Sequence, residues 1–182
     1  MGLLTIFPSA GHHLNDPGAV YHGYTEASLM IMFRNKLTKI LDDLGYKFII
    51  DKDHETNTQY QNRIKPGVGS VIADYHANAA LNQNASGVEC FVSDNPTVNS
   101  LKMANELCAV TAEILNIPNR GVKKPSETAR GTIGILKKPG TVVLCELFFL
   151  SNKNDLEKFL KNIDALANAH AYILAKYEDL IP

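Results

Sequence analysis

The stretch Val71-Ile72-Ala73-Asp74-Tyr75-His76-Ala77-Asn78-Ala79 decides the fold of this 182-residue chain. An apolar run typical of a buried strand stops at His76, and small and polar residues follow at once. In open α/β sheets, ligands gather beyond the carboxyl ends of the strands. A histidine at such a strand end is more often structural than metal-binding, so its role depends on residues elsewhere in the chain.

The segments on either side of this strand alternate between strand-like and helical patterns. Further strands are predicted over residues 3–7, 47–50, 87–92, 132–136 and 141–150. Helical periodicity predicts helices over 25–44, 96–115 and 152–177, the last of these as one helix or two. Residues 54–66 are predicted to form a rim loop or a short helix, and the basic stretch 119–125 is predicted to be a loop.

The order of these elements predicts an α/β fold. We expect a single domain spanning residues 1–182, with one mixed, mainly parallel six-stranded sheet and helices on both faces. The connection between strands 69–75 and 87–92 is too short for a crossover helix, which favours an adjacent antiparallel pairing.

Composition excludes several classes of partner. Eighteen Lys and Arg against 19 Asp and Glu give a net charge of -1, so there is no basic field for nucleic acid. No apolar run is long enough to insert into a membrane, and residues 1–7 lack the features of an export signal. The three cysteines show no ligand spacing and are expected to be reduced core residues, in a chain that we expect to be monomeric.

Two further candidate ligands precede the central strand. His12 lies in a Gly- and Pro-rich loop directly after the first predicted strand. Glu26 begins the helix over 25–44 and falls on its apolar face, although the helix dipole alone also favours a carboxylate there.

Glu146 is the clearest anomaly in the sequence, because it interrupts the apolar strand over 141–150. A carboxylate in such a strand needs a partner, a shifted pKa or a functional role. Two histidines and a glutamate form a sufficient ligand set for catalytic zinc. His12, Glu26 and His76 would then bind Zn2+, and Glu146 would take the proton from the attacking water, which describes an amide hydrolase.

The same residues resemble the zinc-dependent N-acetylmuramoyl-L-alanine amidases of the amidase-3 class. The resemblance covers nearly the whole chain, in the order and approximate spacing of the family. It is carried by the segments Gly11-His12, Asp16-Pro17-Gly18-Ala19, Glu26, Asp74-Tyr75-His76-Ala77-Asn78-Ala79, Ala85-Ser86-Gly87-Val88-Glu89, Asn119-Arg120-Gly121-Val122-Lys123 and Val143-Leu144-Cys145-Glu146-Leu147-Phe148-Phe149-Leu150-Ser151-Asn152. It implies hydrolysis of the amide between the lactyl group of N-acetylmuramic acid and L-alanine.

Three positions depart from the family pattern. Ser9 stands where Asp is common, His13-Leu14 replaces a Gly pair, and Lys137 stands where Arg is common. His13 could therefore compete as a ligand, and a contact from Lys137 would not be bidentate. As substrate-binding residues we expect Asn78, Arg120 and Lys137.

The resemblance implies an enzyme that acts on peptidoglycan or muropeptides at the cell wall. It would be a phage-type lysin or a secreted or periplasmic bacterial enzyme whose signal has been removed. The alternatives are a zinc amidohydrolase of smaller muropeptides or N-acyl amino acids, and a non-catalytic wall-binding module. A buried Glu146 argues against the last of these, because a binding module needs no base.

Overall fold

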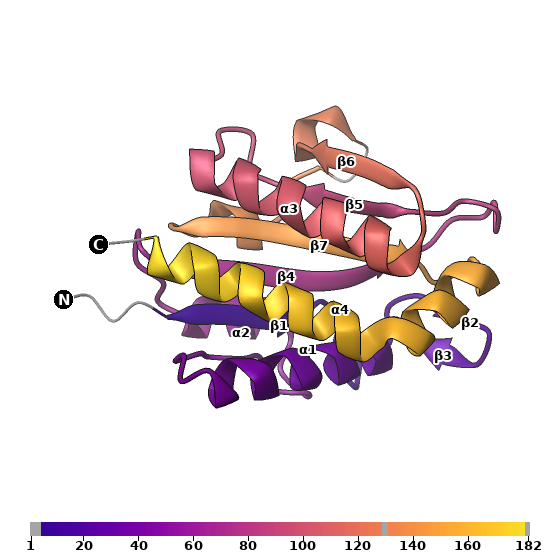
Figure 1. Cartoon of the computed structure of the whole chain (residues 1–182), viewed down its shortest axis with the longest axis horizontal. Coiled ribbons are helices and arrows are strands. Elements are labelled where there is room, and N and C mark those ends of the chain that lie inside the picture. The colour runs from indigo at the N-terminus through magenta and orange to yellow at the C-terminus, as the bar shows by residue number, and fades with distance from the viewer. Residues whose placement is uncertain (1–4, 129–130, 181–182) are drawn as a thin grey trace.

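A computed structural model describes residues 5–128 and 131–180 of the chain. At its centre is a five-stranded sheet with strand order β1-β4-β7-β5-β6, beside a small two-stranded sheet (Figure 1). The strands are β1 Ile6–Ala10, β2 Val20–Tyr21, β3 Tyr24–Thr25, β4 Val71–Asn78, β5 Val88–Phe91, β6 Asn119–Lys123 and β7 Thr141–Phe149. The helices are α1 Glu26–Asp43, α2 Asn57–Arg63, α3 Val98–Leu115 and α4 Lys153–Asp179, with short 3-10 helices η1 Pro125–Glu127 and η2 Ile135–Lys137.

The strand directions bring functional residues to one edge of the sheet. Strands β1, β4 and β7 are parallel to one another, β5 is antiparallel to β7, and β6 is parallel to β5. The carboxyl ends of β1, β4 and β7 therefore meet the amino ends of β5 and β6. The prediction of a mixed, mainly parallel sheet is confirmed.

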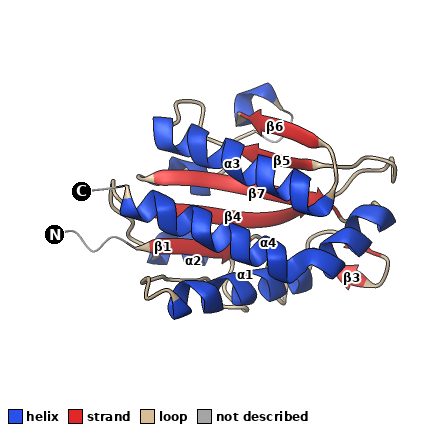
Figure 2. Cartoon of the chain, viewed as in Figure 1, coloured by secondary structure: helices blue, strands red, loops and turns tan. Residues whose placement is uncertain are grey.

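Helices cover both faces of this sheet, as predicted, but unequally. The long helices α1, α3 and α4 cover one face and enclose the larger apolar core (Figure 2). On the other face, Tyr60 and Ile64 of the α2 region and Leu136 of η2 pack over Ile72 and Leu144. Successive side chains of a strand point to opposite faces. His76 therefore lies on the same face of the sheet as Ile72 of the smaller core, further towards the carboxyl end of β4.

The helix boundaries follow capping residues that are visible in the sequence. The Thr25 hydroxyl accepts a hydrogen bond from the Ser28 amide at 3.1 Å and begins α1, and Asn152 caps α4 through its side chain. The predicted helices over 25–44, 96–115 and 152–177 are confirmed. The last is one continuous helix of 27 residues. The region 54–66 contains the short helix α2, which opens with a capping box at Thr56.

The predicted count of six strands in the main sheet is wrong, because the sheet has five strands in the described part of the chain. Residues 47–50 contribute only an isolated bridge from Phe48 to Ile6, and 132–136 runs into the 3-10 helix η2, where Ile135 and Leu136 are buried without strand pairing. Conversely, the basic segment predicted as a loop is the edge strand β6. Edge strands are often short and charged, which hides them from a search for apolar runs.

The predicted pairing of β5 with β4 is also wrong, because β7 lies between them. Strand β4 already pairs with β1 on one side and β7 on the other, so it has no free edge. In the described part of the chain, the first strand runs over Ile6–Ala10, three residues beyond the predicted end at Phe7, and the predicted residues Leu3 and Leu4 lie outside the described residues. Pro8 fits within it because β1 is an edge strand.

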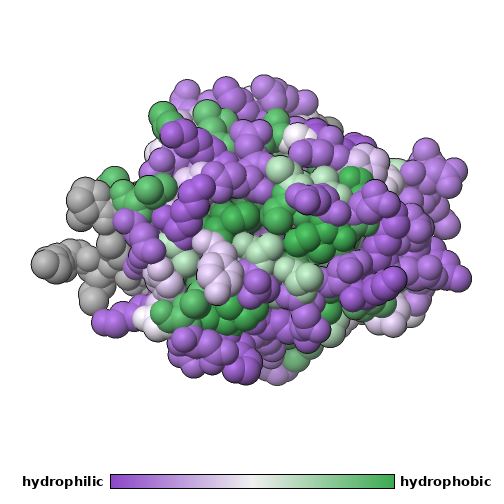
Figure 3. Space-filling view, viewed as in Figure 1, coloured by the Kyte–Doolittle hydropathy of each residue, from purple (hydrophilic) through white to green (hydrophobic). Residues whose placement is uncertain are grey.

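The helical face of the molecule is mainly hydrophilic around its periphery, and apolar side chains are visible towards its centre (Figure 3). Across residues 5–128 and 131–180, none of the helices has the length and apolar character needed to cross a membrane. Cys90, Cys108 and Cys145 are free thiols buried in the core, as expected.

Candidate functional site

Three side chains from three different elements form a cluster at the sheet edge. His12 lies in the loop after β1, Glu26 is the first residue of α1, and His76 lies near the end of β4. One potential ligand atom from each lies within 4.8 Å of the other two. The structure thus brings together the three residues that the sequence predicted as metal ligands.

Glu26 joins the two histidines. Its Oε1 lies 2.9 Å from His76 Nδ1, and its Oε2 lies 3.4 Å from His12 Nε2. The backbone amides of Ala77 and Ala19 also donate to this carboxylate, each at 3.1 Å. Burial alone would raise the pKa of Glu26, but His76, His12 and the Ala19 amide together outweigh it and lower the pKa. The carboxylate is therefore held ionised, the form that binds metal.

The second nitrogen of each imidazole faces another carboxylate. His12 Nδ1 lies 3.0 Å from Asp16 Oδ2, and His76 Nε2 lies 3.4 Å from Asp74 Oδ2. Ser9 Oγ donates to Asp74 Oδ1 at 2.6 Å. Metal-binding histidines usually donate their other N–H to such an acceptor, which fixes the ring orientation. The cluster therefore has the outer partners of a metal site.

The roles of Asp16 and Asp74 were not predicted from the sequence, although the spacing of Asp74 carried a signal. Asp74 precedes His76 by two residues, which places both side chains on one face of a strand. Burial alone would lower the pKa of His76, but hydrogen bonds to Asp74 and Glu26 raise it well above its ordinary value. Protons will therefore compete with a metal ion for this imidazole.

Two glycines make room for the cluster. A Cβ atom at Gly11 would lie 2.1 to 2.3 Å from three atoms of the His76 ring. Gly18 has φ +64°, and a Cβ there would lie 2.6 Å from Glu26 Oε2. Two imidazoles and a carboxylate, backed by carboxylates and enclosed by glycines, fit the donor set that zinc accepts.

Glu146 stands beside the cluster because of strand register. It pairs with His76 across the parallel strands β4 and β7, so both side chains lie on the same face of the sheet. Glu146 is 1% exposed and lines a cleft of about 290 Å³ together with His12, Glu26, His76 and Asn78. The carboxylate that interrupts an apolar strand is therefore buried at the floor of the candidate site.

A second buried carboxylate, Glu89, continues this row on β5, where it pairs in register with Glu146. Glu89 accepts hydrogen bonds from Asn78 Nδ2 at 2.8 Å, Arg120 Nε at 2.7 Å and Lys123 Nζ at 2.5 Å. Burial alone would raise the pKa of Glu89, but Arg120 and Lys123 outweigh it and lower the pKa. The role of Glu89 was missed, although it interrupts an apolar strand in the same way as Glu146.

The remaining predicted site residues divide into two groups. Asn78 lines the cleft, and both Asn78 and Arg120 donate hydrogen bonds to Glu89. The Arg120 guanidinium also lies 4.9 Å from the centre of the Phe149 ring. Lys137, in contrast, lines a different cavity with Asp94 and Ser126. The ring of His13 accepts a hydrogen bond from the Asn15 amide and is not part of the metal cluster.

Comparison with known proteins identifies the family. A sequence model for N-acetylmuramoyl-L-alanine amidases matches residues 6–175. The uncharacterized Bacillus subtilis protein YqiI is 26% identical over 174 residues, which cover 90% of this chain and 82% of YqiI.

Two solved structures have the same fold. The N-acetylmuramoyl-L-alanine amidase from Clostridium difficile 630 superposes with a TM-score of 0.81 at 20% identity, covering 100% of both chains. The amidase AmiC2 of Nostoc punctiforme superposes with a TM-score of 0.76 at 20% identity, covering 98% of both chains. With the family match over most of its length, the chain belongs to the N-acetylmuramoyl-L-alanine amidase family and is an enzyme of that class, which hydrolyses an amide bond of peptidoglycan.

Proposed function

We propose that this amidase is a zinc enzyme that cleaves the bond between the lactyl group of N-acetylmuramic acid and L-alanine. His12, Glu26 and His76 would hold the ion, with ligand atoms within 4.8 Å of one another. A bound zinc ion supplies Lewis acidity, which polarises a carbonyl group and makes water more acidic. The observation that carries the proposal is the register of Glu146 with His76 across β4 and β7.

Glu146 acts as the general base in this proposal. Its carboxylate takes a proton from the attacking water, the hydroxyl adds to the lactyl carbonyl carbon, and the C–N bond breaks. Glu146 then returns the proton to the leaving amine of L-alanine, so one water is consumed for each bond cleaved. Burial at the floor of the cleft keeps the carboxylate near the reacting atoms and away from bulk solvent.

Asn78 and Arg120 are proposed to bind the substrate. Asn78 lines the cleft beside the metal cluster, and the Arg120 side chain is 38% exposed. A guanidinium has five N–H donors, so Arg120 can bind Glu89 through Nε and still reach a substrate carbonyl or carboxylate. Stem peptides carry both of these acceptors.

Replacing Glu146 tests the mechanism. In Glu146→Gln, we expect stoichiometric zinc by elemental analysis but a decrease in stem-peptide release of about 10²-fold or more, the scale of general-base catalysis. Glu89→Gln is a matched comparison, since Glu89 lies next to Glu146 in register. Because Glu89 holds the proposed substrate-binding residues, this variant should raise KM and keep most of kcat. Cleavage at the wild-type rate by Glu146→Gln would exclude Glu146 as the base.

The substrate assay separates the proposed function from its alternatives. Intact sacculi, soluble muropeptides and N-acyl amino acids are incubated with the zinc-loaded protein, and products are identified by mass spectrometry. We expect free stem peptides from sacculi, consistent with action at the cell wall as a secreted or periplasmic enzyme or a lysin. Cleavage of only the small substrates would favour an amidohydrolase, and binding to sacculi without any cleavage would indicate a wall-binding module.

A further inference from the structure

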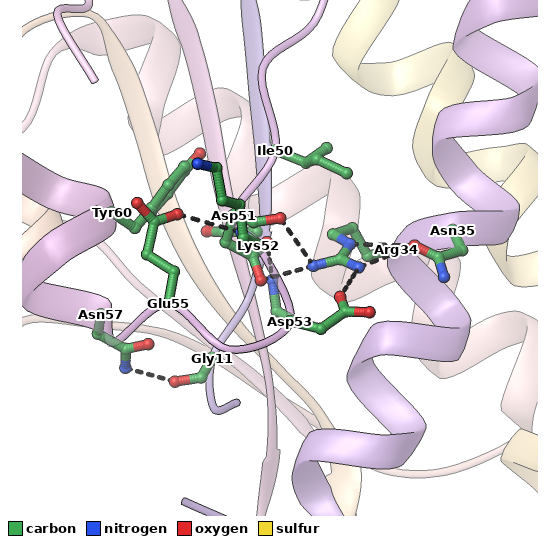
Figure 4. A network of polar contacts seen from close by, with 12 residues as sticks. Gly11, Arg34, Asn35, Ile50, Asp51, Lys52, Asp53, Glu55, Asn57 and Tyr60 are labelled. Atoms are coloured by element: carbon green, nitrogen blue, oxygen red, sulfur yellow. Dashed lines mark hydrogen bonds and ion pairs between the residues drawn. The ribbon is translucent and has the colours of Figure 1, made fainter. Parts of the chain in front are cut away.

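A buried arginine lies on the same helix as Glu26, eight residues further along α1. Arg34 is 2% exposed, and its Nη1 lies 2.5 Å from Asp51 Oδ2 while its Nη2 lies 2.6 Å from Asp53 Oδ1 (Figure 4). Nη1 also donates to the Asp51 carbonyl at 3.2 Å, and Nε donates to Asn35 Oδ1 at 3.2 Å. The guanidinium thus fixes the segment that follows residues 47–50 against α1.

Stability alone is a weak reason for this arrangement. Removing charges from water is unfavourable, and replacing a buried ion pair by apolar residues is often neutral or stabilising. What a buried ion pair can provide is a defined conformation. Here the ion pairs hold Asp51 and Asp53 in fixed positions beside α1.

Residues 51–57, which include the Arg34 partners Asp51 and Asp53, contact the chain around His12 at three points. Asp51 Oδ1 accepts a hydrogen bond from the Ala10 amide at 3.0 Å, and the Asp53 carbonyl accepts one from the Leu14 amide at 2.8 Å. Asn57 donates from its side chain to the Gly11 carbonyl (Figure 4). These contacts lie on both sides of His12 along the chain.

We propose that Arg34, Asp51, Asp53 and Asn57, the Arg34 cluster, are positioning residues that hold the His12 loop in its metal-binding conformation. Helix α1 then supplies one ligand directly, through Glu26, and fixes a second ligand through Arg34. A loop held in advance loses less conformational freedom when the ion binds. This inference rests on the metal site of the proposed function, and it concerns metal affinity rather than substrate binding.

The test measures zinc affinity of the metal-free protein by competition with a chelator, in Asn57→Ala and Arg34→Met. We expect Kd for zinc to rise about tenfold or more in both variants, the scale found for outer partners of metal ligands. KM for the peptide substrate should stay unchanged. Asn57→Ala removes only the bond to Gly11, so the test does not depend on Arg34→Met remaining folded.

Leu37→Ala is the matched control. Leu37 is fully buried in the apolar core one turn further along α1, and its truncation weakens the fold by leaving a cavity. At temperatures where it is folded, Leu37→Ala should bind zinc with the wild-type Kd. An equal loss of affinity in this control, or wild-type affinity in Asn57→Ala, would overturn the proposal.

Hydrogen exchange separates this inference from the proposed function. In metal-free wild-type protein, the Leu14 and Ala10 amides should be protected from hydrogen exchange, and Arg34→Met should increase the exchange rates of both. If the wild-type protein binds no zinc, the proposed metal site fails, and exchange alone decides the positioning role. Unchanged protection in Arg34→Met would refute it.

Discussion

Asp74 is the buried partner of the His76 ring, and its replacement tests how far metal affinity depends on ring orientation. The Asp74 side chain is 9% exposed and lies 3.4 Å from His76 Nε2. In Asp74→Asn the carboxylate charge is lost while the side-chain shape is kept. We expect Kd for zinc to rise about 10- to 100-fold, measured by chelator competition.

Asp16 offers the matched comparison for this prediction. It has the same relation to His12, at 3.0 Å, but its side chain is 53% exposed. Solvent screens exposed charges, so Asp16→Asn should weaken zinc binding by a few-fold only. Equal effects of the two variants would show that burial does not set the strength of these contacts.

Gly11 tests whether the space beside His76 is required. The Cβ of Gly11→Ala would overlap the imidazole ring, since three ring atoms lie within 2.3 Å of its position. We expect the ring to be displaced and stoichiometric zinc binding to be lost, by elemental analysis after dialysis. Gly67→Ala is the control, because nothing lies within 4 Å of a Cβ there, and it should bind zinc like the wild type.

The clustering of the candidate ligands could be predicted from the sequence, whereas contacts that depend on packing could not. His12, Glu26 and His76 each stand at the end or start of a regular element, and Glu146 interrupts an apolar strand. In the sequence pattern, Arg34, in contrast, is indistinguishable from an ordinary polar residue of an amphipathic helix. Its partners lie 17 and 19 residues further along the chain, in a turn that no local pattern connects to α1.

At the scale of elements, helix α1 couples folding to the candidate metal site. Thr25 caps α1 by accepting from the Ser28 amide, and the next residue is Glu26, whose backbone amide donates to the Ala19 carbonyl at 2.8 Å. Loss of an N-cap costs about 1 kcal/mol. Thr25→Ala should therefore destabilise the protein by that amount and also weaken zinc binding, because the first turn of α1 frays around Glu26.

Thr97 is the equivalent cap of α3 and accepts from the Ser100 amide at 3.0 Å. Thr97→Ala should cost a similar free energy of unfolding in urea, but it should leave Kd for zinc unchanged, since α3 supplies no ligand to the cluster. A loss of zinc affinity in Thr97→Ala as large as in Thr25→Ala would mean that global stability, and not the start of α1, controls the site.

Helices were more predictable than strands for a physical reason. A helix carries its apolar period and its caps in consecutive residues, as Thr25 and Asn152 show. A strand depends on partners that are distant in sequence. Strand β7 pairs with β4 and β5, and its insertion between them could not be deduced from the short connection after β4. Residues 132–136 met the criteria for a strand, but in the described part of the chain they pair with no strand of the sheet, and Ile135 and Leu136 pack in the smaller core instead.

At the scale of the whole molecule, one buried histidine makes the free energy of unfolding depend on pH. His170 of α4 is fully buried, with Thr111 Oγ1 2.8 Å from its Nε2 and the Tyr75 hydroxyl 3.4 Å from its Nδ1. Phe33 contacts it edge-on, with ring centroids 5.5 Å apart. From α4, His170 packs against helices α1 and α3 and strand β4, so it is a core residue. Burial lowers its pKa from 6.5 to about 3.

This lowered pKa predicts a loss of stability in acid. Below pH 6.5 the unfolded chain protonates His170 while the folded protein does not until about pH 3, so the free energy of unfolding decreases as pH falls through that window. The slope from one such group approaches about 1.4 kcal/mol per pH unit.

His170→Gln keeps a hydrogen-bonding partner for Thr111 but does not titrate. Urea unfolding of both metal-free proteins at pH 7 and pH 5 should show the wild type losing about 2 kcal/mol more than the variant. Other titrating groups, including His76, are common to both proteins and cancel in this difference, so equal losses would mean that His170 is protonated in the folded core.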